Sequence, residues 1–198
     1  KIAIKGRGGH SAEPHHALNP MPIQKAVKAV LDAVRANTLG PFDPNVLEPV
    51  FEHAGLEEVT NSIPDEAVSW YAVRTMLPPK EHAEYLEKLE EAARATVSIF
   101  NAASVECERV LGHPAVINDE ACFEQVDALL REAGMRRKKL PPALGGDDLA
   151  HYTSKVPGMI MYLGAGGPGC PDHHAPDFNP SEEMLWMGVL YWLLIATN

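Results

Sequence analysis

A chain of 198 residues with 45% hydrophobic and 22% charged residues has enough apolar material for one medium or two small globular domains. Its formal net charge of −10 argues against nucleic acid as a partner, because binding to phosphates needs clustered Lys and Arg, and the one basic run, at residues 136–139, is short. Three widely spaced cysteines form no disulfide framework, which favours a reducing compartment such as the cytoplasm.

The first half of the chain shows strand and helix patterns in a defined order. Runs rich in Val, Phe, Trp and Tyr predict strands, and apolar residues at helical spacing predict helices. We expect strands at residues 2–4, 46–55, 67–76 and 103–111, and helices at 20–37 and 79–100. This order is that of the split βαβ (ferredoxin-like) fold, an α+β arrangement with an antiparallel sheet and two helices on one face. We place a domain boundary near residues 112–114.

The second half has a different pattern. A helix is expected at residues 119–133 with Asn118 as its N-cap, and a short strand at 158–164. After a loop rich in Gly, Pro and His, a capping-box pattern opens the final helix, with Asn179, Pro180 and Glu182. Its apolar run of 13 residues is shorter than the roughly 20 that a bilayer span needs, so we expect a buried helix and no membrane partner. One strand and two helices do not close a core, which indicates part of a larger α/β domain.

A formal G-x-G-x-x-G follows the strand expected at 158–164. Its glycines are Gly164, Gly166 and Gly169. A dinucleotide site needs a helix that begins in this loop, and three prolines oppose such a helix, at Pro168, Pro171 and Pro176. The motif therefore does not predict a nucleotide site.

The histidines of the same loop are candidate metal ligands. His173 and His174 lie beside two aspartates, and neutral imidazole binds transition metals. The alternative is a surface loop whose histidines cap backbone groups, because two adjacent histidines do not easily bind one ion together. The residue types alone leave both readings open.

Three residues of the first half are candidates for binding. His10 follows two glycines that permit tight backbone geometry, although it could be an ordinary polar loop residue. Asn61 begins a turn, where Asn is expected for local reasons. Arg74 shares a predicted strand face with Trp70 and other apolar residues, where a charge needs a partner or an anionic ligand.

Four ordered segments carry a resemblance to a known family. They are GRGGHSAEPHHALNP, NSIPDEAVSWYAVRT, GGDDLAHYTSKVPG and HHAPDF. In this order they resemble the dimetal amidohydrolases, a metallopeptidase family that includes aminoacylases, carboxypeptidase G and succinyl-diaminopimelate desuccinylase. The sequences of the first and last segments are most similar to the branch that hydrolyses N-acyl amino acids, hippurate and auxin conjugates. Where the family usually has Glu-Asp-Phe, this chain has Asp-Asp-Leu at 147–149.

The resemblance implies a catalytic α/β domain interrupted by a smaller lid that dimerises. Residues 1–112 would be that lid, and 113–198 the C-terminal segment of the catalytic domain. His10 would reach across a homodimer and help to stabilise the oxyanion in the partner's active site. Asn61 would contact the substrate, Arg74 would hold its carboxylate, and His174 of the H-x-P-x-F segment would bind a metal ion.

The remaining active-site motifs of that family precede the lid and do not occur in this chain. The resemblance implies two divalent ions, of zinc, manganese, nickel or cobalt, and one histidine cannot hold both. We therefore expect part of a metal-dependent amidohydrolase or carboxypeptidase acting on N-acyl amino acids or related peptides, inactive as the isolated chain. The alternatives are a free-standing dimerisation or small-molecule-binding module, and one half of a split enzyme.

Overall fold

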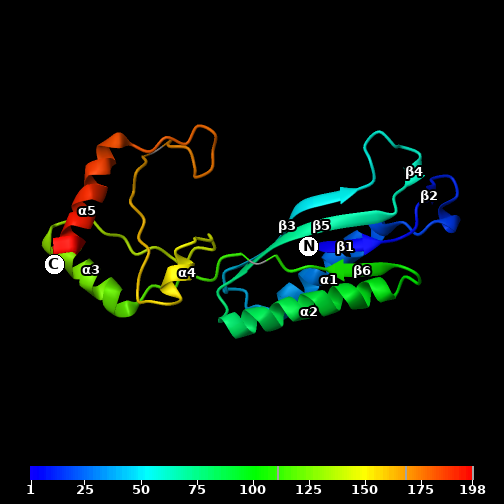
Figure 1. Cartoon of the computed structure of the whole chain (residues 1–198), viewed down its shortest axis with the longest axis horizontal. Helices are drawn as coiled ribbons and strands as arrows, with labels where there is room; N and C mark the ends of the chain where they lie inside the picture. Colours follow the sequence, from blue (N-terminus) through cyan, green and yellow to red (C-terminus); the bar gives the residue numbers. More distant parts are fainter. Residues whose placement is uncertain (111, 168, 198) are drawn as a thin grey trace. The chain divides into compact units, whose positions relative to one another are not determined.

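The computed structural model describes residues 1–110, 112–167 and 169–197. Its contacts divide the chain into two compact units (Figure 1). The first unit comprises Lys1–Gly112 and Pro142–Gly145, and the second comprises His113–Pro141 and Gly146–Asn198. Leu111, at which the last strand of the first half was expected to end, and Pro168 of the glycine motif lie outside the described residues.

An antiparallel sheet of four strands forms the first unit, in the spatial order β3-β5-β1-β6. Figure 1 shows both long helices on the same side of this sheet. The elements are β1 (Ile2–Lys5), α1 (Pro20–Thr38), β3 (Asn45–Ala54), β5 (Glu66–Thr75), α2 (Pro79–Ser98) and β6 (Ser104–Cys107). The predicted split βαβ fold is confirmed, with β6 shorter than the expected strand at 103–111.

Local signals explain where α1 and α2 begin. The Asn19 side chain accepts a hydrogen bond from the Met21 N–H at 3.0 Å, and a proline stands at the first position of each helix. Each helix then buries an apolar stripe against the sheet. The buried core consists of Ile2, Ile4, Ile23, Val27, Leu31, Leu39, Leu47, Tyr85, Leu89, Ala93 and Val97.

The register of β5 decides which of its faces the helices cover. Ala67 pairs with Ile4 and Ser69 with Ile2, so these residues share the face of the core. Because side chains alternate along a strand, Trp70 and Arg74 lie on the opposite face. Arg74 is exposed there. Water reaches its charge there, and its guanidinium also has a backbone partner in the Leu144 carbonyl. The anionic ligand expected for Arg74 stays a prediction.

A two-stranded ribbon lies beyond the main sheet. It pairs β2 (Gly9–His10) with β4 (Ser62–Ile63), with Gly9 opposite Ile63 and His10 opposite Ser62 (Figure 1). A 3-10 turn, η1 (Pro14–His16), follows β2. The sequence predicted only a loop and a turn here, because two residues are too few to show strand alternation.

The second unit contains α3 (Glu120–Glu132), α4 (Ala150–Thr153), a 3-10 turn η2 (Glu182–Met184) and α5 (Leu185–Thr197). The N-cap of α3 is Asp119, whose carboxylate accepts from the Cys122 N–H at 2.9 Å, and not Asn118 as predicted. The Asn118 amide instead bonds both backbone groups of Ile160, at 2.9 and 3.1 Å. The expected strand at 158–164 is not a strand. The backbone of Ile160 bonds to the Asn118 side chain, and no strand among the described residues pairs with the segment.

The final helix differs from expectation at its start and in its burial. The Ser181 N–H donates to the Ala165 carbonyl at 2.7 Å, which holds the chain extended up to Ser181, so the helical region begins at Glu182 and not in a box opened by Asn179. No described residue of α5 is buried, and Trp186 and Trp192 are 61% and 67% exposed. The expected buried helix is thus not buried within this chain. None of the described helices has the length and apolarity that crossing a membrane requires.

The surroundings of His82 on α2 predict that the stability of the chain depends on pH. Its Nδ1 lies 2.8 Å from the Thr75 hydroxyl oxygen, which also accepts from the Leu77 N–H. Burial, and then the positive charge of Arg109, lower the pKa of His82. The unfolded chain, with an ordinary histidine pKa of about 6.5, therefore binds more protons in the window just below that value. Stability contributed by neutral His82 is present above about pH 6.5 and is lost as the pH falls through this window.

We expect His82→Gln to flatten this part of the stability profile. Urea unfolding midpoints measured from pH 8 to pH 5 should fall less for this variant than for the wild type. The matched control is His53→Gln at an exposed position of β3, which should retain the wild-type slope. Equal slopes for wild type and His82→Gln would contradict the assignment.

Candidate functional site

His10 stands at the end of a glycine-rich loop that is pressed against the β4 segment. A Cβ atom at Gly8 would lie 2.7 Å from the Ile63 carbonyl oxygen, and one at Gly9 would lie 3.1 Å from the Ala17 side chain. The approach at Gly8 excludes a side chain, and the contact at Gly9 would be tight. The glycines therefore place the exposed His10 beside β4.

Asn61 lies next to His10. The Ser11 N–H donates to the Asn61 carbonyl oxygen at 3.1 Å, and His10 pairs with Ser62 in the ribbon. Both residues are exposed. The structure thus brings together two of the four predicted site residues, at one edge of the first unit.

Arg74 is far from this pair. It lies near the end of β5, whereas β4 immediately precedes the start of β5 (Figure 1). At about 3.3 Å per residue, the length of β5 between Glu66 and Arg74 is roughly 25 Å. Its guanidinium donates one hydrogen bond from Nη1 to the Leu144 carbonyl at 2.6 Å, which leaves further N–H donors for an anion. His10 and Arg74 of one chain therefore do not contact the same small ligand.

His174 belongs to the second unit and has an uncommon backbone conformation. Its φ angle is +67°, in the left-handed region that few residues other than glycine adopt. A turn surrounds it, in which the Ala175 N–H donates to the Asp172 carbonyl at 3.1 Å. Strained backbone of this kind is concentrated at functional sites. The histidine side chain is exposed.

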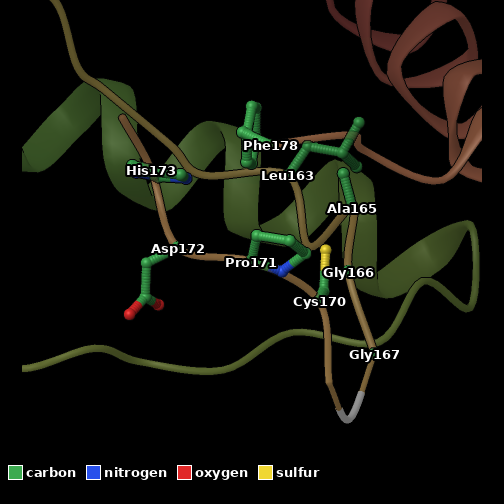
Figure 2. A pocket seen from close by; sticks show the side chains of 9 residues that line it. All are labelled: Leu163, Ala165, Gly166, Gly167, Cys170, Pro171, Asp172, His173 and Phe178. Carbon is green, nitrogen blue, oxygen red and sulfur yellow. The ribbon is translucent and has the colours of Figure 1, made fainter. Parts of the chain in front are cut away.

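An open cavity of about 400 Å³ lies beside this histidine loop (Figure 2). Its lining includes Cys170, Asp172 and His173, and the His173 ring meets Phe178 edge to face at 5.4 Å between centroids. Figure 2 shows the Asp172 carboxylate pointing away from the Cys170 thiol. His174 is not part of this lining.

No group of three His, Cys, Asp or Glu side chains converges to hold a metal ion in the part of the chain that is described. A protein metal site needs several such ligands in one place. Among the described residues, His174 therefore fits one position of a metal site and no more. The glycine motif at 164–169 likewise opens no helix in the described residues before Glu182.

Sequence reasoning missed Asp65 in the turn that precedes β5. Its carbonyl oxygen accepts from the Gly6 N–H and its carboxylate Oδ1 accepts from the Gly8 N–H, both at 2.7 Å. Asp65 thereby ties the glycine loop to the β4 segment. An aspartate within a turn is unremarkable locally, and only its hydrogen bonds to residues far along the chain reveal this contact.

Comparison with known proteins places this arrangement in a family. The M20 peptidase dimerisation domain matches residues 1–101. Thermostable carboxypeptidase 2 of Saccharolobus solfataricus is 26% identical over 99% of this chain and 50% of its own length. An N-acetyldiaminopimelate deacetylase of Enterococcus faecalis is 29% identical over 95% of this chain and 49% of its own length. The chain thus spans about half the length of the curated relatives it matches.

The fold agrees with solved structures. A dinuclear metal-binding M20 peptidase of Bacillus subtilis superposes with a TM-score of 0.71 and 21% identity, over 98% of this chain and 47% of that one. The resemblance inferred from the four sequence segments is confirmed. Because the dimerisation-domain match covers residues 1–101 of 198, this chain belongs to the M20 peptidase family.

Proposed function

We propose that this chain is the lid and C-terminal segment of a metal-dependent amidohydrolase or carboxypeptidase that hydrolyses the amide bond of N-acyl amino acids or related peptides. Residues 1–112 serve as the lid and dimerisation domain, and residues 113–198 belong to the catalytic domain. The names of the relatives, a carboxypeptidase and a deacetylase, support this class of reaction. The observation that carries the proposal is the β2–β4 pairing, which brings His10 to Asn61.

In this proposal two protomers supply one site. His10 donates a hydrogen bond to the developing oxyanion, and Asn61 beside it contacts the substrate. Arg74 binds the free carboxylate of the substrate through two parallel N–H groups. The long separation between His10 and Arg74 along β5 supports a site to which one chain gives His10 and its partner gives Arg74. A homodimer formed through the first unit meets this requirement.

His174 supplies one imidazole ligand to a pair of divalent ions of zinc, manganese, nickel or cobalt. Such ions, when bound, provide an activated water and polarise the amide carbonyl. The positive φ of His174 and the dinuclear metal-binding relative support this role. One imidazole does not hold two ions, so we expect no hydrolysis by the 198-residue chain alone. Three cysteines that are free of disulfides support the cytoplasm as its compartment.

The test is the intact mass of the protein as its native source produces it, with metal analysis and an assay on N-acyl amino acids. We expect a mass about twice the 21.6 kDa of this chain, about two metal ions per protomer and amide hydrolysis that chelation abolishes. The isolated chain should show no turnover under the same conditions. A source protein of 21.6 kDa without metal or activity would contradict the proposal and favour a binding module. Co-purification with a second polypeptide that restores activity would indicate a split enzyme.

A further inference from the structure

In the glycine loop before His10, the N–H groups of Gly6 and Gly8 both donate to Asp65, while Arg7 between them bonds to the backbone of Leu18. Asp65 accepts from Gly6 through its carbonyl oxygen and from Gly8 through Oδ1, each at 2.7 Å. The second bond joins a carboxylate to a backbone N–H, a charge-assisted bond that is stronger than one between neutral groups. The Asp65 side chain thus holds the last part of the loop, at Gly8, two residues before His10.

The residues that follow β2 form a turn whose backbone bonds to the His10 ring. The Ala12 N–H donates to His10 Nδ1 at 3.1 Å, and the Glu13 N–H donates to the His10 carbonyl at 2.9 Å. An imidazole nitrogen that accepts a hydrogen bond carries no proton. Neutral His10 in this turn therefore has its proton on Nε2, on the edge of the ring away from Ala12.

We propose that Asp65 is a positioning residue that, through the glycine loop, holds His10 as the Nε2–H tautomer. His10 then presents a neutral N–H donor whose other nitrogen is occupied by a backbone group. A donor fixed in this way before the reaction needs no rearrangement when negative charge develops on a substrate oxygen. This inference rests on the proposed role of His10, but the tautomer is measurable without catalysis, so the two proposals fail independently.

The experiment is a nitrogen-15 NMR spectrum of the histidine rings in the full 198-residue chain at pH 8, where ordinary histidines are neutral. His10→Gln identifies the His10 resonances by their loss. We expect Nε2 to be protonated and Nδ1 to be unprotonated. The ratio of the Nε2–H tautomer to the Nδ1–H tautomer should be about fivefold higher than in a short Gly-Gly-His-Ser-Ala peptide, which is the change that one net hydrogen bond gives. A protonated Nδ1, or the ratio of the free peptide, would overturn the proposal.

Variants of Asp65 test its part. Asp65→Ala should return the His10 ratio to that of the peptide, while Asp65→Asn, which keeps an acceptor oxygen, should retain the wild-type ratio. The matched control is Glu66→Ala, which removes an exposed carboxylate from the adjacent residue and should change nothing. If Asp65→Ala fails to give a folded spectrum, Asp65→Gly replaces it with the same expected result, because Gly is a turn-forming residue without a side-chain acceptor. A folded Ala or Gly variant with the wild-type ratio would refute the role of Asp65.

Discussion

Gly6→Ala should lower the free energy of unfolding of the first unit by at least about 3 kcal/mol, the upper range for overpacking of a closely packed site. A Cβ at this position would lie 2.1 Å from the Leu18 carbonyl oxygen and 3.1 Å from Pro20 Cδ. Leu18 cannot move freely, because its N–H and C=O are both bonded to the backbone of Arg7, at 2.7 and 2.9 Å. It also leads directly into α1, whose buried side chains are fixed in the core.

Urea unfolding of the full chain, followed by circular dichroism, measures this effect. The NMR amide signals of β1 and β5, recorded through the same titration, show whether the first unit is the part that unfolds. The matched control is Gly112→Ala, where a Cβ would meet nothing within 4 Å and the change should stay within about 0.5 kcal/mol. An unfolding midpoint for Gly6→Ala equal to that of the control would show that the contact of Gly6 with Leu18 is not tight.

His174→Ala, introduced into the protein as its native source produces it, should remove one metal ion per protomer and reduce amide hydrolysis at least about a hundredfold. Loss of a residue that only orients a ligand already costs about 10- to 100-fold, and loss of the ligand itself costs more. The adjacent residue provides the control. His173 lines the neighbouring cavity and packs against Phe178, so His173→Ala should keep both ions and most of the activity.

Metal content by mass spectrometry of the purified variants, with hydrolysis rates on the same samples, separates the outcomes. Loss of metal from His173→Ala but not from His174→Ala would reverse the assignment of the two neighbours. Unchanged metal content in both variants would remove this loop from the proposed metal site. Both results would leave the proposed roles of His10 and Asn61 in the first unit to be tested separately.

Much of the first unit is predictable from short stretches of sequence. Proline at the first position of α1 and α2, the Asn19 cap and the apolar stripes lie within single helices, so their signals do not depend on distant contacts. The long strands β3 and β5 are similarly marked by their Val, Phe, Trp and Tyr content. The four ordered motifs indicated the family, and the resemblance pointed to the candidate site residues.

Other features depend on partners elsewhere in the chain. The segment at 158–164 has a strand-like composition, yet the backbone of Ile160 bonds to the Asn118 side chain, and the described residues offer no neighbouring strand with which it could pair. The apolar α5 reads as a buried helix, but burial requires an opposing surface that the described residues do not supply. Composition records how apolar a segment is and not what covers it.

The sequence by itself determined the split βαβ order, the starts of α1 and α2, and the choice of His10, Asn61, Arg74 and His174 as candidates, because these rest on local periodicity and on the residues of the four motifs. Only the tertiary structure decided that β2 pairs with β4, that Asp65 anchors the glycine loop and that Arg74 lies at the far end of β5 from His10. These facts follow from strand register and from contacts between residues far apart in the chain, which no local pattern encodes.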